Sequence, residues 1–327
     1  MYRILLVATF PVEHLLRQTP GGSGVWGACQ FVSEPDGGPC DAVVVYDNCP
    51  RPIECYCAPE NTLLITGEPP SLRRYRRPFT AQFGHVWTSH RQIDHPGVRY
   101  GAEGQPWHYG LYASQVHGRP LNYTDLENLP PPRKTKLCSV ICSTKSTTTD
   151  HRQRLAFIER LRAEFGEQID IFGRGMRPVR DKADAIYAYR YHLALENDHS
   201  PFYMTEKLTD AFLGWSYPLY FGGEEAQHWF PTGSFLRLDI HQPDIAVGMV
   251  RDMLQHDLTD EQRNALDSAR RIVLQRANIM ARLAEFWPRA LVAAPPRRLR
   301  ILPKRCSTQL AFRYWTHRLS SPRRSAA

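Results

Sequence analysis

Short apolar runs alternate with helical patterns along much of the chain, and this alternation limits the fold more than any other feature. Runs that predict strands are "RILLVATF", "DAVVVYDN" and "TLLITGE" in the first half, and "LCSVICS", "IDIFG", "YRYHLALEN" and "YPLYFGG" in the second. Between them, one helix is expected from its cap Asp150 to Gly166 and another from its cap Thr205 to Gly214. Strands separated by helices predict parallel sheets covered on both faces, with ligands at the carboxyl ends of the strands.

Two domains are expected, because 327 residues exceed the usual length of a single domain. The proline-rich stretch "NLPPPRKTK" at 128–136 is typical of a linker. Two long helical patterns follow at 242–256 and 259–287, and Pro288 is expected to end the second. The simplest architecture is a pair of α/β domains that face each other across a cleft. The expected boundaries are 1–128 for the N-terminal domain, 129–288 for the C-terminal domain and 289–327 for a tail.

The composition is that of a globular protein, with 42% hydrophobic and 23% charged residues and no apolar run long enough to span a bilayer. The start, "MYRILLVATFPVEH", carries one basic residue and an apolar run that breaks at Pro11, which fits a first strand better than a signal peptide. A cytoplasmic protein is therefore expected. The eight cysteines form no paired Cys-x-x-Cys set, so we expect reduced thiols rather than cysteine-bound zinc or a disulfide framework.

Positive charge gathers at the C-terminal end of the chain. The net charge is +8, and residues 288–327 hold ten basic residues and no acidic one, so the remainder is nearly neutral. Apolar side chains interleave with these arginines, as in segments that lie on anionic membrane surfaces, here the inner face of the membrane. A solvated tail is the other interpretation, and the sequence favours neither. Nucleic acid is not an expected partner, because no basic stripe continues into the folded body.

The stretch "ENDHSPFYMTEKLTDAF", residues 196–212, joins a polar loop to a helix. With Thr205 as the N-cap, Glu206 and Lys207 occupy the first turn, where free N–H groups and the helix dipole favour an anion. Because the charge of Lys207 opposes the dipole, an anionic ligand such as a diphosphate would explain the lysine. The alternative is an exposed lysine paired with Glu206, Asp210 or another carboxylate.

Further polar residues are expected to face the same region. Glu196, Asn197 and Tyr203 lie near the end of the preceding strand, and Glu196 could either bind loop N–H groups or contact a ligand. Glu206 could accept hydrogen bonds from a ribose diol, as acidic residues do in nucleotide sites. In "STKSTTTDHRQR", after another strand, Arg154 or Arg152 could reach a phosphate, while a solvated helix face remains the alternative.

The segment "YRYHLALENDHSPFYMTEKLTDAFLGWSYPLYFGG" resembles the donor-binding signature of the α-1,3-fucosyltransferases, glycosyltransferase family 10. That signature runs Y-[KR]-F-x-L-x-F-E-N-S, a variable loop, Y-[IV]-T-E-K-[IL], then a helix and P-[VI]-x-[YW]-x-G. Three further stretches resemble the family in order: "CDAVVVYDN", "LLITGEPPS" and "CSVICSTKSTTTDHRQRLAFIERL". The resemblance implies a GT-B fold, with an N-terminal acceptor domain and a C-terminal GDP-fucose domain.

The resemblance also implies roles for individual residues. Lys207 and Arg154 would neutralise the diphosphate, Glu206 would bind the ribose, and Asn197 and Tyr203 would line the donor pocket. Thr205, Glu196 and Arg152 would support that site. Glu68 matches the glutamate proposed as the general base; taken alone, it is a carboxylate at a strand end, before two prolines that fix its loop.

The implied reaction is an inverting transfer of fucose from GDP-fucose to a hydroxyl of a glycan acceptor. Since cationic side chains can balance the diphosphate and no Asp-x-Asp pair stands out, no essential metal is expected. Asp198, Pro201-Phe202 and the ending "YFGG" depart from the family pattern and leave the identity of the sugar open. A transferase for another nucleotide sugar and a non-catalytic glycan- or nucleotide-binding protein are the alternatives.

Overall fold

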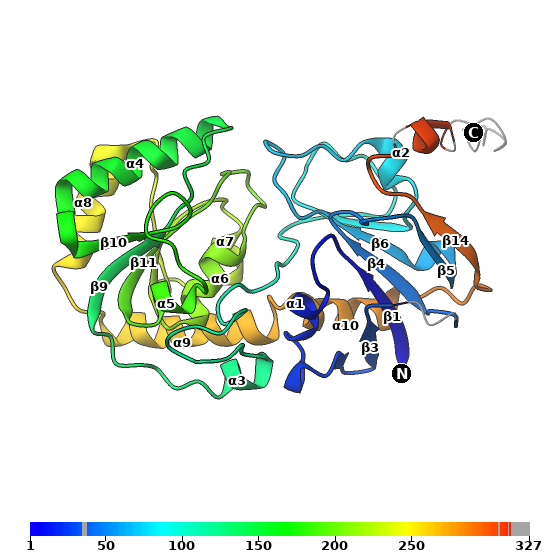
Figure 1. The fold of residues 1–327 in the computed structure, drawn as a ribbon, viewed down its shortest axis with the longest axis horizontal. Coiled ribbons are helices and arrows are strands. Elements are labelled where there is room, and N and C mark those ends of the chain that lie inside the picture. Colours follow the sequence, from blue (N-terminus) through cyan, green and yellow to red (C-terminus); the bar gives the residue numbers. More distant parts are fainter. Residues whose placement is uncertain (35–37, 307, 313, 315–327) are drawn as a thin grey trace. The chain divides into compact units, whose positions relative to one another are not determined.

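The fold is described from a computed structural model, in which residues 1–34, 38–306, 308–312 and 314 are described (Figure 1). The chain separates into two compact units. Unit 1 consists of Met1–Glu13, Gly27–Glu103 and Ala284–Ala327, and unit 2 of His14–Trp26 and Gly104–Leu283.

Unit 1 is built on a parallel sheet in the order β3-β1-β4-β6-β7-β8. Its central strands are the apolar runs expected from the sequence, and residues such as Val43, Leu64 and Val86 are fully buried. A separate antiparallel pair joins β5 to β14. The strands are β1 Tyr2–Val7, β3 Cys29–Val32, β4 Ala42–Tyr46, β5 Ile53–Cys57, β6 Thr62–Ile65, β7 His85–Thr88, β8 Val98–Tyr100 and β14 Arg297–Ile301; the short helix α2 is Arg77–Thr80.

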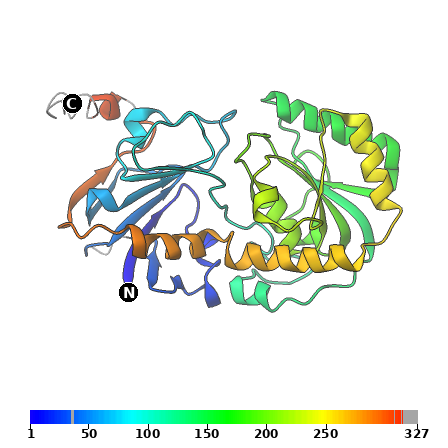
Figure 2. The same cartoon turned by 180° about the vertical axis from the view of Figure 1, so that it is seen from behind.

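Unit 2 contains a parallel sheet in the order β10-β9-β11-β12-β13. Helices α4 and α8 pack on one face of this sheet through residues such as Phe157, Leu161 and Val250, whereas α6 packs against β11 and β12 together with α9 (Figures 1 and 2). The strands are β9 Lys136–Ile141, β10 Ile169–Phe172, β11 Tyr189–Leu195, β12 Tyr217–Phe221 and β13 Leu236–Arg237. The helices are α3 Tyr123–Glu127, α4 Thr149–Phe165, α5 Ala183–Ile186, α6 Glu206–Leu213, α7 Ala226–Trp229, α8 Pro243–Leu254 and α9 Asp260–Gln275.

Three further elements lie near the points where the chain passes between the two units: α1 Glu13–Leu16, β2 Val25–Trp26 and α10 Ile279–Ala290. The single helical pattern expected at 259–287 forms two helices, α9 and α10. Asn278 lies between them, and its side-chain oxygen accepts a hydrogen bond from the N–H of Met280 (2.9 Å), which caps the start of α10. Pro288 lies inside α10 rather than ending it, so that expectation was wrong. None of the helices within the described residues combines the length and the apolar character needed to cross a bilayer.

Both units are α/β structures with parallel sheets, which confirms the fold class expected from the alternation of strands and helices. Two such units are the components of the GT-B-like architecture that the resemblance implies. The contiguous boundaries 1–128 and 129–288 differ from the compact units, because residues 104–128 belong to unit 2 and the described residues from 284 onward belong to unit 1. The facing of the two domains across a cleft stays a prediction.

Part of the expected basic tail, β14, is a folded strand. In β14 the side chains of Arg298 and Arg300 are exposed, Ile301 is buried, and Leu302 after it is buried in the core of unit 1. The tail interpretation is therefore wrong for 297–302, since alternating arginine and aliphatic residues here fit a strand with one buried face. The expected membrane-contacting residues Arg313, Trp315, Arg318, Leu319, Arg323 and Arg324 lie outside the described residues.

Candidate active site

The loop after β11 is fastened to the start of α6 by a buried carboxylate. Glu196 is fully buried, and its carboxylate accepts hydrogen bonds from the N–H (2.7 Å) and the hydroxyl (2.7 Å to Oε2) of Thr205, the N-cap of α6. Burial raises the pKa of Glu196, and the positive charge of Lys207 opposes this shift. Both carboxylate oxygens thus contact protein groups, which is the geometry of the structural role considered for Glu196.

Lys207 lies in the first turn of α6, with its ammonium group among protein oxygens. Its Nζ is 3.1 Å from the Thr205 hydroxyl, 3.2 Å from Glu196 Oε2 and 3.6 Å from Glu206 Oε1. Its N–H points at the Thr205 hydroxyl (3.3 Å). Thr205 caps the helix as expected, and the pairing of Lys207 with Glu206 that was considered is present. The same ammonium group also lies at the positive end of the α6 dipole, so its charge and the helix dipole both attract an anion there.

A second lysine, which the sequence analysis did not single out, balances Glu206. Lys182 Nζ lies 3.1 Å from Glu206 Oε1 and 2.8 Å from Oδ2 of the fully buried Asp210. Burial alone would raise the pKa of Glu206, but Lys182, Lys207 and His108 together hold it well below its usual value. Glu206 is therefore an ionised hydrogen-bond acceptor. Lys182 was missed because it is 24 residues from Glu206 in a segment without a motif.

Arg154 and Asn197 meet at the carboxyl end of the sheet. Arg154 is buried on α4, and its guanidinium donates to Asn197 Oδ1 and to the carbonyl of Leu195 (3.4 Å). Among the described residues, its buried Nε has no hydrogen-bond partner. Arg152, in contrast, is exposed and donates to Ser146 O (3.3 Å) and the Thr149 hydroxyl (3.2 Å). Only Arg154 of the two joins the residues around the α6 N-terminus.

Tyr203 is buried in the loop between β11 and α6, where its N–H donates to the carbonyl of Ser200 (2.9 Å). The same loop is held internally by Asp198, which is buried and accepts a hydrogen bond from the N–H of Ser200 (2.7 Å). An aspartate at this position thus shapes the loop that departs from the family pattern.

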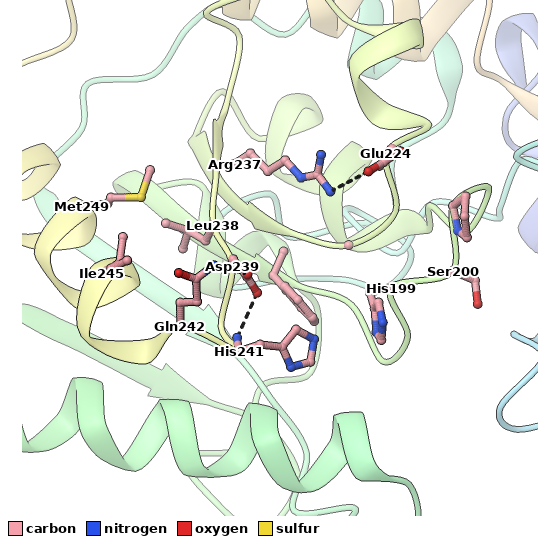
Figure 3. A pocket seen from close by; sticks show the side chains of 13 residues that line it. His199, Ser200, Glu224, Arg237, Leu238, Asp239, His241, Gln242, Ile245 and Met249 are labelled. Atoms are coloured by element: carbon pink, nitrogen blue, oxygen red, sulfur yellow. Dashed lines mark hydrogen bonds and ion pairs between the residues drawn. The ribbon is translucent and has the colours of Figure 1, made fainter.

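A cavity of about 750 Å³ opens beside these residues, at the carboxyl ends of β12 and β13 (Figure 3). Its lining comes from the β11–α6 loop, the ends of both strands and the first turns of α8. The residues are His199, Ser200, Pro201, Phe221, Gly222, Glu224, Arg237, Leu238, Asp239, His241, Gln242, Ile245 and Met249. None was singled out as a site residue from the sequence, although the strand-end rule applied to "RLDIHQ" could have indicated Asp239 and His241.

Glu68 belongs to unit 1, at the carboxyl end of β6. It is partly exposed, and its backbone carbonyl lies 2.7 Å from Nε2 of the buried His90, which follows β7. The next residue, Pro69, is buried. Glu68 and the α6 residues are thus in different units.

A carboxylate that the sequence analysis missed contacts Thr66, two residues before Glu68. Glu103 is fully buried, and its Oε1 accepts hydrogen bonds from the hydroxyl of Thr66 (2.5 Å) and the N–H of Ser89 (2.7 Å). Burial raises its pKa to about 7, against the effect of these hydrogen bonds. Glu103 therefore ties the loop after β6 to the loop after β7. No signal in the sequence marks it, because it lies in a coil segment 37 residues from Thr66.

Comparison with known proteins gives a direct match for the part of the chain that contains α4, α6 and the cavity. Residues 131–257 match the family model of the glycosyltransferase family 10 (fucosyltransferase) C-terminal domain. No curated protein matches the chain.

Solved structures show weaker similarity. One crystal structure of an α1,3-fucosyltransferase shares 14% identity over 83% of this chain and 80% of its own, with a TM-score of 0.47. Another, of an α1,3-fucosyltransferase with GDP-fucose, shares 15% identity over 85% and 90%, with a TM-score of 0.44. A glycosyltransferase from Rickettsia africae ESF-5 shares 12% identity over 90% and 99%, with a TM-score of 0.48. At such values, these similarities decide neither the fold nor the activity.

The family match covers the motif from Tyr189 to Gly223 and every residue named around the α6 N-terminus. It therefore agrees with the resemblance found in the sequence. The chain is a glycosyltransferase whose residues 131–257 match the C-terminal domain of glycosyltransferase family 10.

Proposed function

We propose that this glycosyltransferase moves fucose from GDP-fucose to a hydroxyl group of a glycan acceptor, with inversion at the anomeric carbon. The observation that carries the proposal is the α6 N-terminus within the family 10 domain, where Thr205, Glu206 and Lys207 stand together at the end of a parallel sheet. A nucleotide diphosphate suits this position, because backbone N–H groups, the helix dipole and an ammonium group all attract its charge.

The donor residues divide by charge. Lys207 would neutralise the diphosphate from the helix end, and Arg154 would do so from α4, where its Nε has no protein partner among the described residues. Glu206, kept ionised by its lysines, would accept hydrogen bonds from the ribose hydroxyls. Asn197 and Tyr203 would line the pocket beside Arg154. Thr205 and Glu196 would support it by fixing the start of α6.

Glu68 would act as the general base. A strand-end carboxylate that is partly exposed can approach an acceptor hydroxyl, provided that it comes within hydrogen-bond reach in the complex. The hydroxyl would attack the anomeric carbon, its proton would pass to Glu68, and GDP would leave as Lys207 and Arg154 stabilise the charge on the diphosphate.

Two substitutions separate donor binding from chemistry. Lys207→Ala is expected to weaken GDP binding roughly tenfold to a hundredfold, because it removes a charge-assisted contact. Glu68→Ala is expected to leave GDP affinity unchanged and to lower kcat by about 10²- to 10⁴-fold, as loss of a general base does. Calorimetric titration with GDP and a transfer assay with GDP-fucose and N-acetyllactosamine-type acceptors measure the two effects.

Arg152→Ala is the matched control for this experiment, because Arg152 is an exposed cation on the same helix as Arg154. It should bind GDP as the unchanged protein does. Thermal unfolding of Lys207→Ala checks that the loss of GDP affinity is not a loss of fold, since this change leaves Glu196 buried without its cation. Near-normal turnover by Glu68→Ala would refute the role of Glu68 as general base. If the protein neither transferred nor hydrolysed any GDP-sugar, the proposed transferase activity would be refuted.

The second candidate function is transfer of a different sugar from its nucleotide. The observation that supports this candidate is the loop from Asp198 to Phe202, which departs from the family pattern. Asp198 replaces the usual serine and is buried, with its carboxylate bound to the N–H of Ser200. A thermal-shift panel of GDP- and UDP-sugars distinguishes the donors. A non-catalytic binding protein would shift with a nucleotide sugar but show no turnover.

We also propose that transfer requires no divalent metal. Lys207, Arg154 and the α6 N-terminus can balance the diphosphate without one. Protein treated with EDTA should therefore keep its transfer rate. Activity that is lost with EDTA and restored only by added metal would contradict this.

Peripheral contact with an anionic membrane remains a proposal for the C-terminal residues beyond β14. Some arginines of the expected tail have protein partners, since Arg298 lies 2.6 Å from Glu54. Four arginines, at 313, 318, 323 and 324, remain in the segment after 312. They could bind anionic lipid headgroups and bring a cytoplasmic enzyme to the inner face of the membrane.

A further inference from the structure

Two histidines and an aspartate, none of them in α6, meet at the rim of the cavity. Asp150 is the second residue of α4, His199 lies in the loop between β11 and α6, and His241 comes shortly before α8. Each follows a different strand of the parallel sheet, β9, β11 and β13, at its carboxyl end. The fold therefore brings together three residues that are spread over more than 90 positions of the chain.

The three side chains are close enough to share one ion. One potential ligand atom from each lies within 4.8 Å of the others, and His199 Nδ1 is 2.9 Å from Asp150 Oδ2. The imidazole rings of His199 and His241 have their centroids 5.0 Å apart, and Figure 3 shows both at the same edge of the cavity. In a tetrahedral zinc site, bonds of about 2.0–2.2 Å separate the ligand atoms by roughly 3.3 Å. Small side-chain rotations suffice to reach this geometry.

The ligand types narrow the choice of metal. Two imidazoles and one carboxylate suit zinc and its neighbours among the transition metals, whereas magnesium and calcium prefer oxygen ligands. Three protein ligands leave a position for water or for an oxygen of a bound molecule. We propose that Asp150, His199 and His241 form a binding site for one divalent transition-metal ion.

The surroundings hold the ligands near this arrangement. The N–H of His241 donates to Asp239 Oδ1 (3.0 Å), and Asp239 Oδ2 accepts from the side chain of Gln242 (3.0 Å), so the loop before α8 is fixed. Both imidazoles also contact the ring of Phe221, with centroids 6.3 and 5.3 Å away. The alternative explanation of this cluster is a simple hydrogen bond between His199 and Asp150. That hydrogen bond would not require His241, whereas a metal site requires all three side chains.

Occupation of this site would fix the β11–α6 loop, because His199 would be tied to α4 and to the loop before α8. That loop contains Asp198 and Pro201-Phe202, and His199 and His241 line the cavity. The ion would thus set the shape of the rim rather than take part in the transfer, which agrees with a reaction that survives EDTA. The inference does not depend on the proposed donor or acceptor.

The test titrates the full chain, stripped with EDTA and freed of the chelator, with Zn²⁺ by calorimetry and with Co²⁺ by absorption. We expect one saturable ion per chain, binding of Zn²⁺ that is weakened roughly tenfold or more in His199→Ala, His241→Ala and Asp150→Asn, and no heat with Mg²⁺. His228→Ala is the matched control, an exposed histidine on α7 outside the cavity, and should bind as the unchanged protein does.

The Co²⁺ spectrum separates this site from cysteine binding, because thiolate ligands give an intense charge-transfer band that imidazole and carboxylate ligands lack. Circular dichroism of each variant without metal checks that the fold is kept, and His241→Gln replaces His241→Ala if it is not. Absence of saturable binding would overturn the proposal. Equal affinity for Zn²⁺ in the unchanged protein and in the folded His241 variant would also overturn the proposal, because His241 would then not be a ligand.

Discussion

Glu103 shows how a single residue can depend on contacts that no local pattern reveals. Its Oε1 accepts two hydrogen bonds, while its Oε2 is buried without a partner among the described residues. The pKa of about 7 follows from this burial. At neutral pH the carboxyl group is therefore near the midpoint of its titration, in a position that links the loops after β6 and β7.

The raised pKa of Glu103 predicts a pH dependence of stability. The folded state binds the proton more tightly than the unfolded state, so the contribution of Glu103 is fully present below pH 4.5 and is lost as the pH rises to about 7. The loss is about 3 kcal/mol, from 1.36 kcal/mol for each pH unit between 4.5 and about 7. Glu103→Gln should therefore flatten the fall in unfolding free energy between pH 5 and pH 8, as measured by urea denaturation.

Glu13→Gln serves as the control for this prediction, because Glu13 is exposed and also belongs to unit 1. Its pH profile should follow that of the unchanged protein. Parallel profiles for Glu103→Gln and the unchanged protein would mean that the buried carboxyl group does not titrate in this range.

Among the elements, β14 differs most from what the sequence indicated. The run "RRLRI" has the alternation of an edge strand, but its arginines made it resemble a membrane-surface segment. The partner strand β5 lies more than 240 residues earlier in the chain, so the pairing could not be read from local sequence.

The pairing of β14 predicts that its aliphatic residues stabilise unit 1. Ile301→Ala should reduce the unfolding free energy by about 2–4 kcal/mol, because Ile301 is buried in the core. Arg298→Ala, in the same strand, is the control: the Arg298 side chain is exposed, so its loss should leave stability nearly unchanged. Equal denaturation midpoints for the two variants would show that β14 adds little to the core.

At the scale of the whole molecule, the proposed contact with a membrane depends on the arginines after β14. Removal of residues 313–327 deletes four arginines, each of which contributes about 1 kcal/mol near an anionic surface. The shortened protein should bind anionic vesicles roughly tenfold or more weakly than the full chain in a sedimentation assay. Neutral vesicles should bind neither, and equal binding of both proteins to anionic vesicles would contradict the proposal.

The sequence alone determined the α/β class and the start of α6. Strand-length apolar runs, helical periodicity and the Thr205 cap are local properties, which arise from side-chain hydrophobicity and backbone hydrogen bonding within a few residues. The same local order kept the Glu-Asn to Thr-Glu-Lys motif recognisable, and the family match covers it. Of the residues proposed from that motif, Thr205 and Glu206 both lie close to the ammonium group of Lys207 in unit 2.

Only the tertiary structure decided which distant residues complete these sites. It brought Lys182 to Glu206, distinguished buried Arg154 from exposed Arg152, and paired β14 with β5. It also gathered Asp150, His199 and His241 at one rim. The physical reason is that burial and charge pairing depend on distances between side chains, and parallel strands place chain positions far apart in sequence at one edge of a sheet.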